Sequence, residues 1–372
     1  MISPHRIRPF CLLLTALALT GCLSDDESGG NDTSTGRLHF NGFSGLSYQT
    51  ASQSGKTGTN GDFRYYPGER LSFRVGDLPL MDDVPAQPYV TLLEFFPDLR
   101  AALTNPSVDD RGLSTHTLTE LQLLDHVPLA NLTRFLLALN WTENVRDDRG
   151  IEIRDRVIRQ LNAALPDLTS PIDFNVSASE FAATGNPPSP ANQLLSAICF
   201  YPPDNELCDE PPTFAEIDAA PPRPEDENDW DPNVDYREDL QNKRDRILEA
   251  ARSLEDIDAE AARDYLEREL NAITTAVSNR FYLDEETADV PATDTTIKSV
   301  QVRRIAANTN LAEIEAISTR PTDVVVHSYS WQTADVEYFV AGETGGESEL
   351  ILSFRPENTY RWIRKSLRVI IR

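Results

Sequence analysis

The spacing of hydrophobic and polar residues divides the chain into two β-rich ends and a helical middle. Between residues 37 and 90, apolar side chains recur at alternate positions, most clearly over residues 71–75, which is the period of a half-buried strand. The dipeptide Asn60-Gly61 is a strong hairpin signal. Residues 296–372 show the same alternation between turns. We therefore predict an N-terminal β-sandwich module (37–90) and a C-terminal antiparallel β-module (296–372).

The middle of the chain has the longer period of helices. In the region 91–221, Thr117-Leu-Thr-Glu120 has the capping-box pattern that opens a helix. Four leucines of this region share one helical face, namely Leu129, Leu132, Leu136 and Leu139. In the segment 236–283, apolar spacings of seven, four and three predict two amphipathic helices, which most simply pack on each other as a hairpin; the rival interpretation is a coiled coil that binds a partner. The predicted fold class is therefore α+β.

The first 21 residues predict an export signal. Arg6 and Arg8 form a positively charged head, and an apolar run over residues 10–19 follows. That run is too short to span a bilayer, which needs about 20 apolar residues. A charged head, a short apolar middle and small residues at its end are typical of a cleaved signal peptide (1–21).

Residues 19–22, Leu-Thr-Gly-Cys, resemble the lipobox of bacterial lipoproteins. In such proteins the cysteine thiol is acylated and the chain is cut just before it, so the resemblance implies that Cys22 carries a lipid anchor. Residues 22–36 are polar and rich in Gly and Ser, which predicts a flexible tether. Leu23 stands where an Asp commonly retains such proteins in the inner membrane. The resemblance therefore implies the outer membrane, on a face that the sequence leaves open.

Charge and cysteine usage narrow the classes of partner and compartment. The formal net charge is -26, and loss of Arg6 and Arg8 with the signal would bring it to -28 (-26 - 2). Such a surface repels nucleic acid, so we expect no nucleic-acid partner. Once the signal cysteine and the lipidated cysteine are set aside, Cys199 and Cys208 remain. In an exported protein they predict one disulfide, because the spacing is not the Cys-x-x-Cys of a redox site.

The linker 222–235, rich in Pro and acids, contains the best candidate metal ligands. Four oxygen-bearing residues alternate ahead of a predicted helix, as ligands do in calcium loops: Asp229, Asp231, Asn233 and Asp235. The glycine of the sharp turn and the glutamate at the twelfth position are both missing. We favour a solvated acidic linker, with a calcium site as the alternative, and we expect no other cofactor.

No residue pattern indicates catalysis. The five histidines are not paired at metal-ligand spacing, and no Gly-x-Ser-x-Gly elbow occurs. Acidic residues are numerous, but nothing in the sequence places two of them together, as a carboxylate-dependent hydrolase requires. The last twelve residues, 361–372, carry five basic side chains and no acid. We expect them to pair with acidic neighbours rather than to form a patch for an anionic ligand.

Two parts of the chain resemble known envelope proteins. Residues 45–48, 55–65 and 67–76 are similar to the small β-sandwich repeats of bacterial surface proteins, which resemble prealbumin or the regulatory domain of carboxypeptidases. Residues 131–141 and 150–153 are similar to a helix-and-loop element that follows such a module in uncharacterised proteobacterial envelope lipoproteins. Some of those proteins are labelled as related to organic-solvent ABC transport. After the signal, however, this chain has no apolar run long enough to cross a bilayer, so it is not the permease itself.

The resemblance implies a non-enzymatic binding or scaffolding role, with a membrane contact through the lipid and an envelope protein as partner. An accessory role in an envelope transport system for solvent or lipid is the first alternative, together with a surface adhesin. A carboxylate-dependent hydrolase is the third.

The predicted lipid anchor has a direct test. Cys22→Ser removes the thiol that lipid attachment needs, so we expect the variant to leave the membrane fraction while the wild type stays in it. Cell fractionation and mass spectrometry of the mature N-terminus measure both effects. A wild-type N-terminus without lipid, or one that begins at another residue, would contradict the prediction.

Overall fold

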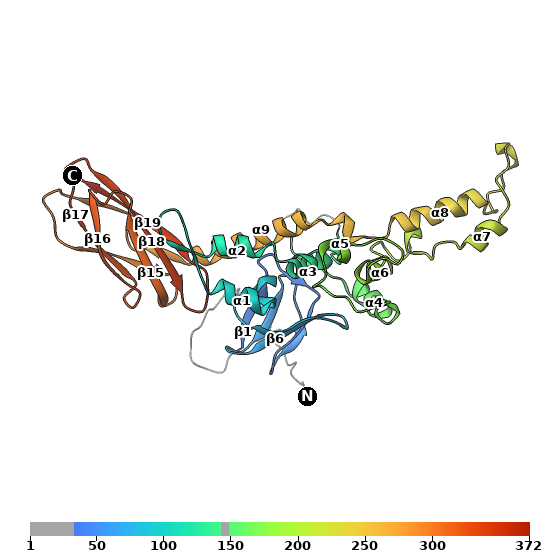
Figure 1. The fold of residues 1–372 in the computed structure, drawn as a ribbon, viewed down its shortest axis with the longest axis horizontal. Helices are drawn as coiled ribbons and strands as arrows, with labels where there is room; N and C mark the ends of the chain where they lie inside the picture. The colour runs from blue at the N-terminus through green and yellow to red at the C-terminus, as the bar shows by residue number, and fades with distance from the viewer. Residues whose placement is uncertain (1–32, 143–148) are drawn as a thin grey trace, which may run out of the picture. The chain divides into compact units, whose positions relative to one another are not determined.

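Strands occupy both ends of the described chain and helices its middle, which confirms the α+β class (Figure 1). The computed structural model describes residues 33–142 and 149–372. The predicted signal, Cys22 and residues 22–32 of the predicted tether lie outside these residues. The tether prediction extends too far, because residues 34–36 belong to the first strand, β1 (Ser34–Leu38). The described residues belong to one unit of the chain, and none of its helices is long and apolar enough to cross a membrane.

The N-terminal region consists of short strands in small sheets. The predicted alternation is present, because every second side chain of β6 (Arg70–Val75) is buried. Gly61 lies in the predicted turn with a left-handed backbone (φ 74°), and a side chain there would collide with the carbonyl of Leu38. The flanking strands join different sheets, so the hairpin prediction at Asn60-Gly61 is wrong. In pairing order the sheets are β5 (Asp62–Tyr65), β1 (Ser34–Leu38) and β8 (Tyr89–Val90); β4 (Ser54–Lys56), β3 (Ser47–Gln49), β6 and β7 (Leu78–Pro85); and β11 (Ile151–Glu152) with β2 (Phe43–Ser44).

The central helices share one hydrophobic core with these strands, and that core runs from Leu38 to Leu270. Residues of the predicted β-module and of the predicted helical region therefore pack together. The four leucines predicted on one face are buried on α3 or at its C-cap, and α9 packs against α3. The main helices are α1 (Pro97–Leu103), α2 (Thr117–Leu123), α3 (Val127–Ala138), α4 (Asp155–Ala164), α5 (Ala178–Phe181), α6 (Pro190–Ser196) and α9 (Ala259–Ser278).

Two arginines bind the backbone around α3 to the segment before α9. Arg134 is buried, and its guanidinium donates hydrogen bonds of 2.6 Å to the carbonyls of Leu254 and Ile257. Arg252 is half-buried and donates hydrogen bonds of 3.0 Å to the carbonyls of Ala138 and Trp141, at the C-terminus of α3. A cation is favoured there, since the last carbonyls of a helix have no partner within the helix.

The predicted helical hairpin in residues 236–283 is not formed. Both helices exist, but α8 (Arg237–Glu249) packs against α7 (Phe214–Ala219) and the 3-10 helix Glu206–Cys208. The only side chain of α8 that is fully buried is Ile247, and Leu248 is 49% exposed. So narrow an apolar stripe cannot cover α9, whose apolar face belongs to the main core.

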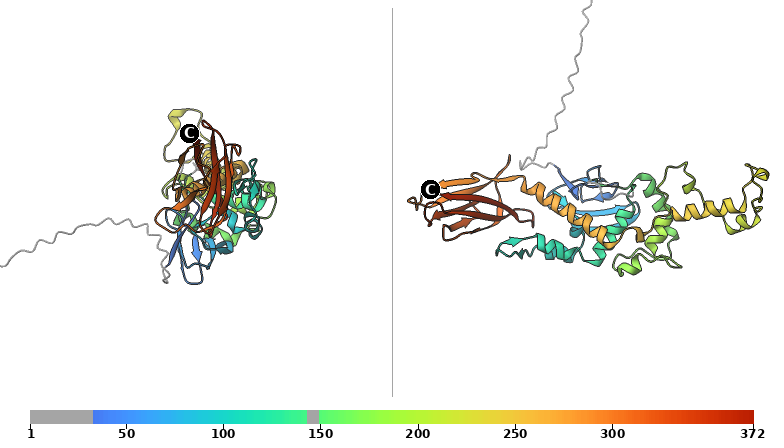
Figure 2. Two further views of the ribbon diagram at one scale, coloured as in Figure 1. Left: turned by 90° about the vertical axis from the view of Figure 1, so that its left-hand side faces the viewer. Right: turned by 90° about the horizontal axis from the view of Figure 1, so that it is seen from above.

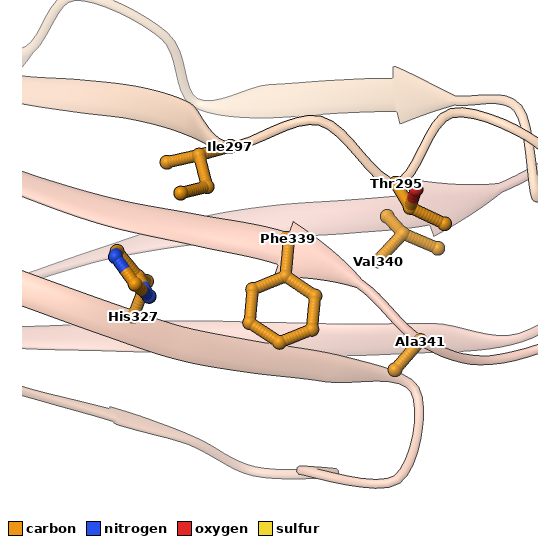
Figure 3. A pocket seen from close by; sticks show the side chains of 6 residues that line it. All are labelled: Thr295, Ile297, His327, Phe339, Val340 and Ala341. Atoms are coloured by element: carbon orange, nitrogen blue, oxygen red, sulfur yellow. The ribbon is translucent and has the colours of Figure 1, made fainter.

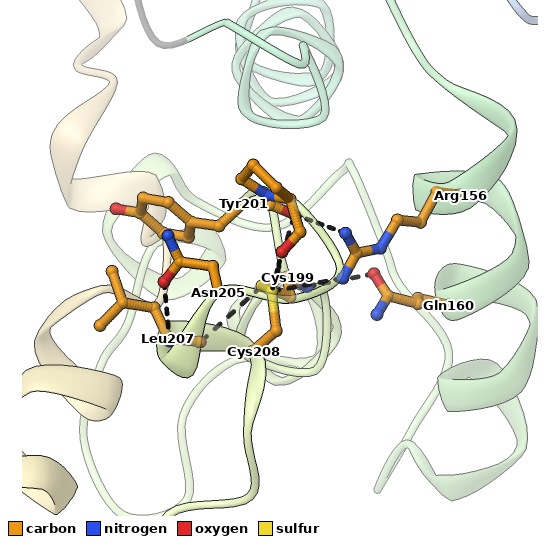
Figure 4. The surroundings of a disulfide bond; sticks show 8 residues. Arg156, Gln160, Cys199, Tyr201, Asn205, Leu207 and Cys208 are labelled. Carbon is orange, nitrogen blue, oxygen red and sulfur yellow. Dashed lines mark hydrogen bonds between the residues drawn. A yellow bond between two sulfur atoms is a disulfide. The ribbon is translucent and has the colours of Figure 1, made fainter.

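The structure contains the predicted disulfide between Cys199 and Cys208 (Figure 4). Two side chains of α4 point toward it. Gln160 accepts a hydrogen bond from the backbone N–H of Cys199 over 3.1 Å, and Arg156 donates to the carbonyl of Tyr201 over 2.5 Å. The disulfide loop is thus attached to α4 as well as closed on itself.

The C-terminal region is a sandwich of two four-stranded sheets with its own hydrophobic core (Figure 1, Figure 2). Seven of its eight strands pair antiparallel, and β13 pairs in parallel with β19. This strand order is that of immunoglobulin-like sandwiches. The sheets are β12 (Phe281–Leu283), β14 (Lys298–Arg304), β17 (Asp335–Val340) and β16 (Val324–Ser330); and β13 (Thr287–Val290), β19 (Ile363–Ile371), β18 (Glu347–Pro356) and β15 (Leu311–Ser318).

The sandwich begins before the predicted boundary at residue 296. Phe281 and Leu283 of β12 and Val290 of β13 are buried in its core. These strands are too short to show a period of their own in the sequence, and α9 leads into them with only a short turn between. The boundary between helix and sheet therefore cannot be identified from the apolar spacing alone.

Candidate functional site

The acidic residues proposed as calcium ligands are exposed, and the structure does not bring them together. One carboxylate oxygen of Asp231 accepts two hydrogen bonds from Asn233, from its backbone N–H (2.9 Å) and its side chain (3.0 Å). Asp229 and Asp235 are also exposed. Within the described ranges, no three His, Cys, Asp or Glu side chains are grouped so that they could hold a metal ion.

Four of the five basic residues at the end of the chain pair with described acids, as the interpretation of the sequence expected. Each of four arginines has a carboxylate partner within 3.3 Å: Arg361 with Glu120, Arg364 with Asp109, Arg368 with Glu347, and Arg372 with Asp289. The last two pairs lie within the sandwich. The first two join the sandwich to the segment that contains α2, and the Arg361 pair is fully buried.

Arg361 is the centre of a buried polar network. Its guanidinium lies 3.3 Å from Glu120 Oε1 and over the ring of Tyr360. The Tyr360 hydroxyl donates to the same Glu120 oxygen over 2.7 Å. Burial raises the pKa of Glu120, and the charge of Arg361 opposes that rise. Glu120 thus pairs with residues of the sandwich. The capping box predicted for Thr117–Glu120 is not formed, because α2 begins after His116 without a side-chain cap.

His116 extends this network to α9. Its Nδ1 accepts a hydrogen bond from the backbone N–H of Trp362 over 3.0 Å. The proton of the neutral ring is therefore on Nε2, which lies 2.9 Å from the hydroxyl oxygen of Thr274. Burial and, after it, the charges of Arg361 and Arg364 lower the pKa of His116 to about 3.

A second contact fixes the sandwich to the same segment. The carboxylate of Glu315 on β15 accepts hydrogen bonds from the backbone N–H (2.9 Å) and the hydroxyl (2.6 Å) of Ser114. The hydroxyl of Ser353 on β18 donates to the carbonyl of Ser114 over 3.0 Å. No described pocket is lined by these groups. The network therefore holds the sandwich against the segment that contains α2.

The outer face of the sandwich carries an open apolar groove of about 460 Å³. Figure 3 shows Phe339 of β17 at the centre of its lining. Ile297, just before β14, is 53% exposed. The rings of His327 on β16 and Phe339 lie edge to face, with their centroids 6.4 Å apart. The register of β16 shifts between Val326 and Ser328, and this bulge leaves His327 exposed. The full lining is Thr295, Ile297, His327, Phe339, Val340 and Ala341.

The sequence analysis missed this groove, although one signal was present. On a half-buried strand polar and apolar residues should alternate, but Tyr338, Phe339 and Val340 are apolar or aromatic in a row. Tyr338 and Val340 face the core, and Phe339 faces outward. When a strand has one solvent-exposed face, a continuous apolar run indicates that apolar side chains also stand on that exposed face.

Comparison with known proteins assigns no relative: no family model matches the sequence, and no curated protein is significantly similar to it.

The buried network predicts that removal of the Arg361 charge is severe. Arg361→Met leaves Glu120 buried without its counter-charge, which typically costs about 3–5 kcal/mol of unfolding free energy. Arg368→Met is the matched control on the neighbouring strand β19, because the Arg368–Glu347 pair is exposed and such pairs contribute about 0–1 kcal/mol. Urea unfolding of the two variants measures the difference. Equal losses in both would contradict a special role of Arg361.

The buried histidines predict a loss of stability in acid. Burial, with a contribution from Arg361, also lowers the pKa of His39 to about 3, as it does for His116. Their ordinary pKa is 6.5, so below that pH the unfolded chain binds protons that the folded chain excludes. Their stabilisation is complete above pH 6.5 and is lost as the pH falls toward 3. We expect a lower urea midpoint at about pH 5.5 than at about pH 7, where few carboxylates titrate. An unchanged midpoint would show that these rings are protonated in the fold.

Proposed function

We propose that this protein is a lipid-anchored lipoprotein of the cell envelope that binds a partner protein through the outer face of its C-terminal sandwich. The observation that carries the proposal is the exposed apolar groove around Phe339. Apolar surface left in water costs roughly 25 cal/mol per Å², and exposed apolar patches on soluble domains mark interaction sites. A cluster of aromatic and aliphatic side chains is also the typical centre of a protein–protein interface.

The lining of the groove favours binding over catalysis. His327 is its only titratable side chain, and no carboxylate or cysteine accompanies it. Acid–base and nucleophilic catalysis both need a second group within hydrogen-bond reach of the first. A carboxylate-dependent hydrolase would need two acids at one cleft, and neither described pocket is lined by two.

The rest of the chain fits a role in contact with another protein. The predicted tether between Cys22 and β1 would hold the folded part near the membrane and still give it reach. A net charge of -26 opposes nucleic acid as the ligand. Sandwiches of this strand order commonly present faces and loops for recognition, which is an argument by analogy of fold. A transport component and a host or surface molecule are the two partners that the test below separates.

Site-specific crosslinking in living cells tests the groove. A photo-reactive amino acid in place of Thr295, at the rim, should trap a specific envelope protein. Ile297→Asp in the same chain places a charge in the apolar contact, and loss of such an anchor typically costs about 2 kcal/mol, or roughly thirtyfold in affinity. Leu248→Asp is the matched control, because Leu248 is an equally exposed aliphatic residue on α8, away from the groove.

The identity of the trapped protein separates the roles. Transporter components would assign an accessory role, and surface or host molecules an adhesive one. If Ile297→Asp and Leu248→Asp reduce the crosslink equally, the groove is not the binding surface. Hydrolysis of an envelope glycan or ester by the purified protein, abolished by a single Asp or Glu substitution, would replace the binding role with an enzymatic one.

A further inference from the structure

A second cavity, of about 370 Å³, lies where the turn between β1 and β2 meets α9. Backbone contacts bring the start of β11 to the same place. The Ile151 N–H donates to the carbonyl of Gly42 over 2.9 Å, and a side chain at Gly150 would collide with the carbonyl of Asn41. The lining comes from all three segments: Phe40, Asn41, Arg149, Tyr265, Arg268, Glu269, Asn271 and Ala272.

The single carboxylate of this lining is already engaged. Glu269 is 2% exposed, and its Oε2 accepts hydrogen bonds from the backbone N–H groups of Phe40 (2.6 Å) and Asn41 (2.9 Å). Its Oε1 accepts one from the Asn41 side chain over 2.6 Å. Glu269 therefore holds the turn in place, and both of its oxygens are occupied by groups of the protein itself.

The charge that remains on the lining is positive. Two guanidinium groups, of Arg149 and Arg268, stand against one carboxylate. Arg268 lines the cavity but has another interaction of its own. Arg149 makes no hydrogen bond or ion pair with any residue that the structure describes. In a chain with a net charge of -26, an unpaired guanidinium at the rim of a pocket is an exception that needs a reason.

The floor of the cavity adds neutral donors. Tyr265 is 2% exposed, and its hydroxyl has no hydrogen-bond partner among the described residues. Burial raises the pKa of Tyr265 well above its usual value, so the hydroxyl keeps its proton. Asn271 contributes an exposed amide at the edge. Buried donors without acceptors are rare in folded proteins and commonly indicate a missing water or ligand.

From this lining we infer that the cavity binds a small anionic ligand of sugar size that carries a carboxylate or a phosphate. The anion lies at Arg149, where a planar guanidinium can donate two parallel hydrogen bonds to an oxyanion. The hydroxyl groups of the ligand meet Asn271 and the floor. The volume is near the lower limit for small-molecule sites, which excludes a polymer inside the cavity. This site is separate from the groove on the sandwich and independent of the proposed function.

Isothermal titration calorimetry on the full-length lipoprotein in detergent tests the inference. Glucuronate and glucose 6-phosphate are the probes, inorganic phosphate tests the bare anion, and glucose is the neutral control. We expect saturable binding of at least one anionic sugar and none of glucose. Arg149→Gln should weaken the binding at least tenfold. Arg111→Gln is the matched control, because Arg111 is an equally exposed arginine outside the cavity.

The probes distinguish the chemical groups that the site can bind. If glucuronate alone binds, the anionic group of the ligand is a carboxylate, and if glucose 6-phosphate binds, it is a phosphate. Binding of inorganic phosphate that Arg149→Gln removes supports the anion site without a sugar. Glucose bound as tightly as its anionic forms, equal affinity in Arg149→Gln and wild type, or no binding of any anion at millimolar concentration would each overturn the inference. None of these results depends on the crosslinking at Thr295.

Discussion

Arg361 lies in the loop between β18 and β19 with 2% of its surface exposed, and its burial constrains how the sandwich meets the rest of the protein. Removing a guanidinium from water costs several kcal/mol unless a counter-charge and hydrogen-bond partners replace the water. Glu120 supplies the counter-charge, and the ring of Tyr360 lies beneath the cation. A shift of the sandwich would separate these groups while both charges stayed buried. The pair therefore selects one arrangement of α2 against the sandwich.

The same principle operates at other places where segments distant in sequence meet. Arg134 on α3 satisfies backbone carbonyls before α9, and Arg252 satisfies carbonyls at the end of α3. The carboxylates of Glu269 and Glu315 satisfy the backbone N–H groups of a turn and of Ser114. In each case a long charged side chain completes the hydrogen bonds of backbone that would otherwise be buried without partners. The surface stays strongly acidic, and a small number of inward-facing charges connect the segments.

The two candidate binding sites differ in the side chains that line them. The groove around Phe339 lies on the outer face of the sandwich and is apolar and open. The cavity beside α9 lies in the part built around the main core, and charged and amide side chains stand in its lining, among them the buried carboxylate of Glu269. The Arg361 network, the Glu315–Ser114 contact and the short turn from α9 into β12 all join the two parts. The described residues thus present an open apolar groove and, separately, a cavity lined in part by charged side chains.

The sequence by itself determined whatever depends on neighbours along the chain. Alternation predicted the strands, the leucine period predicted the face of α3, and elimination among the cysteines predicted the Cys199–Cys208 bond. The lipobox at Cys22 is equally local and stays a prediction. Tertiary structure decided which surfaces meet. Glu120 could cap its own helix or pair with an arginine 241 positions later (361 - 120), and only the fold makes the second partner available. The hairpin at Asn60-Gly61 and the packing of α8 on α9 failed for the same reason, because a local pattern sets the shape of a segment but long-range competition for buried surface sets its partner.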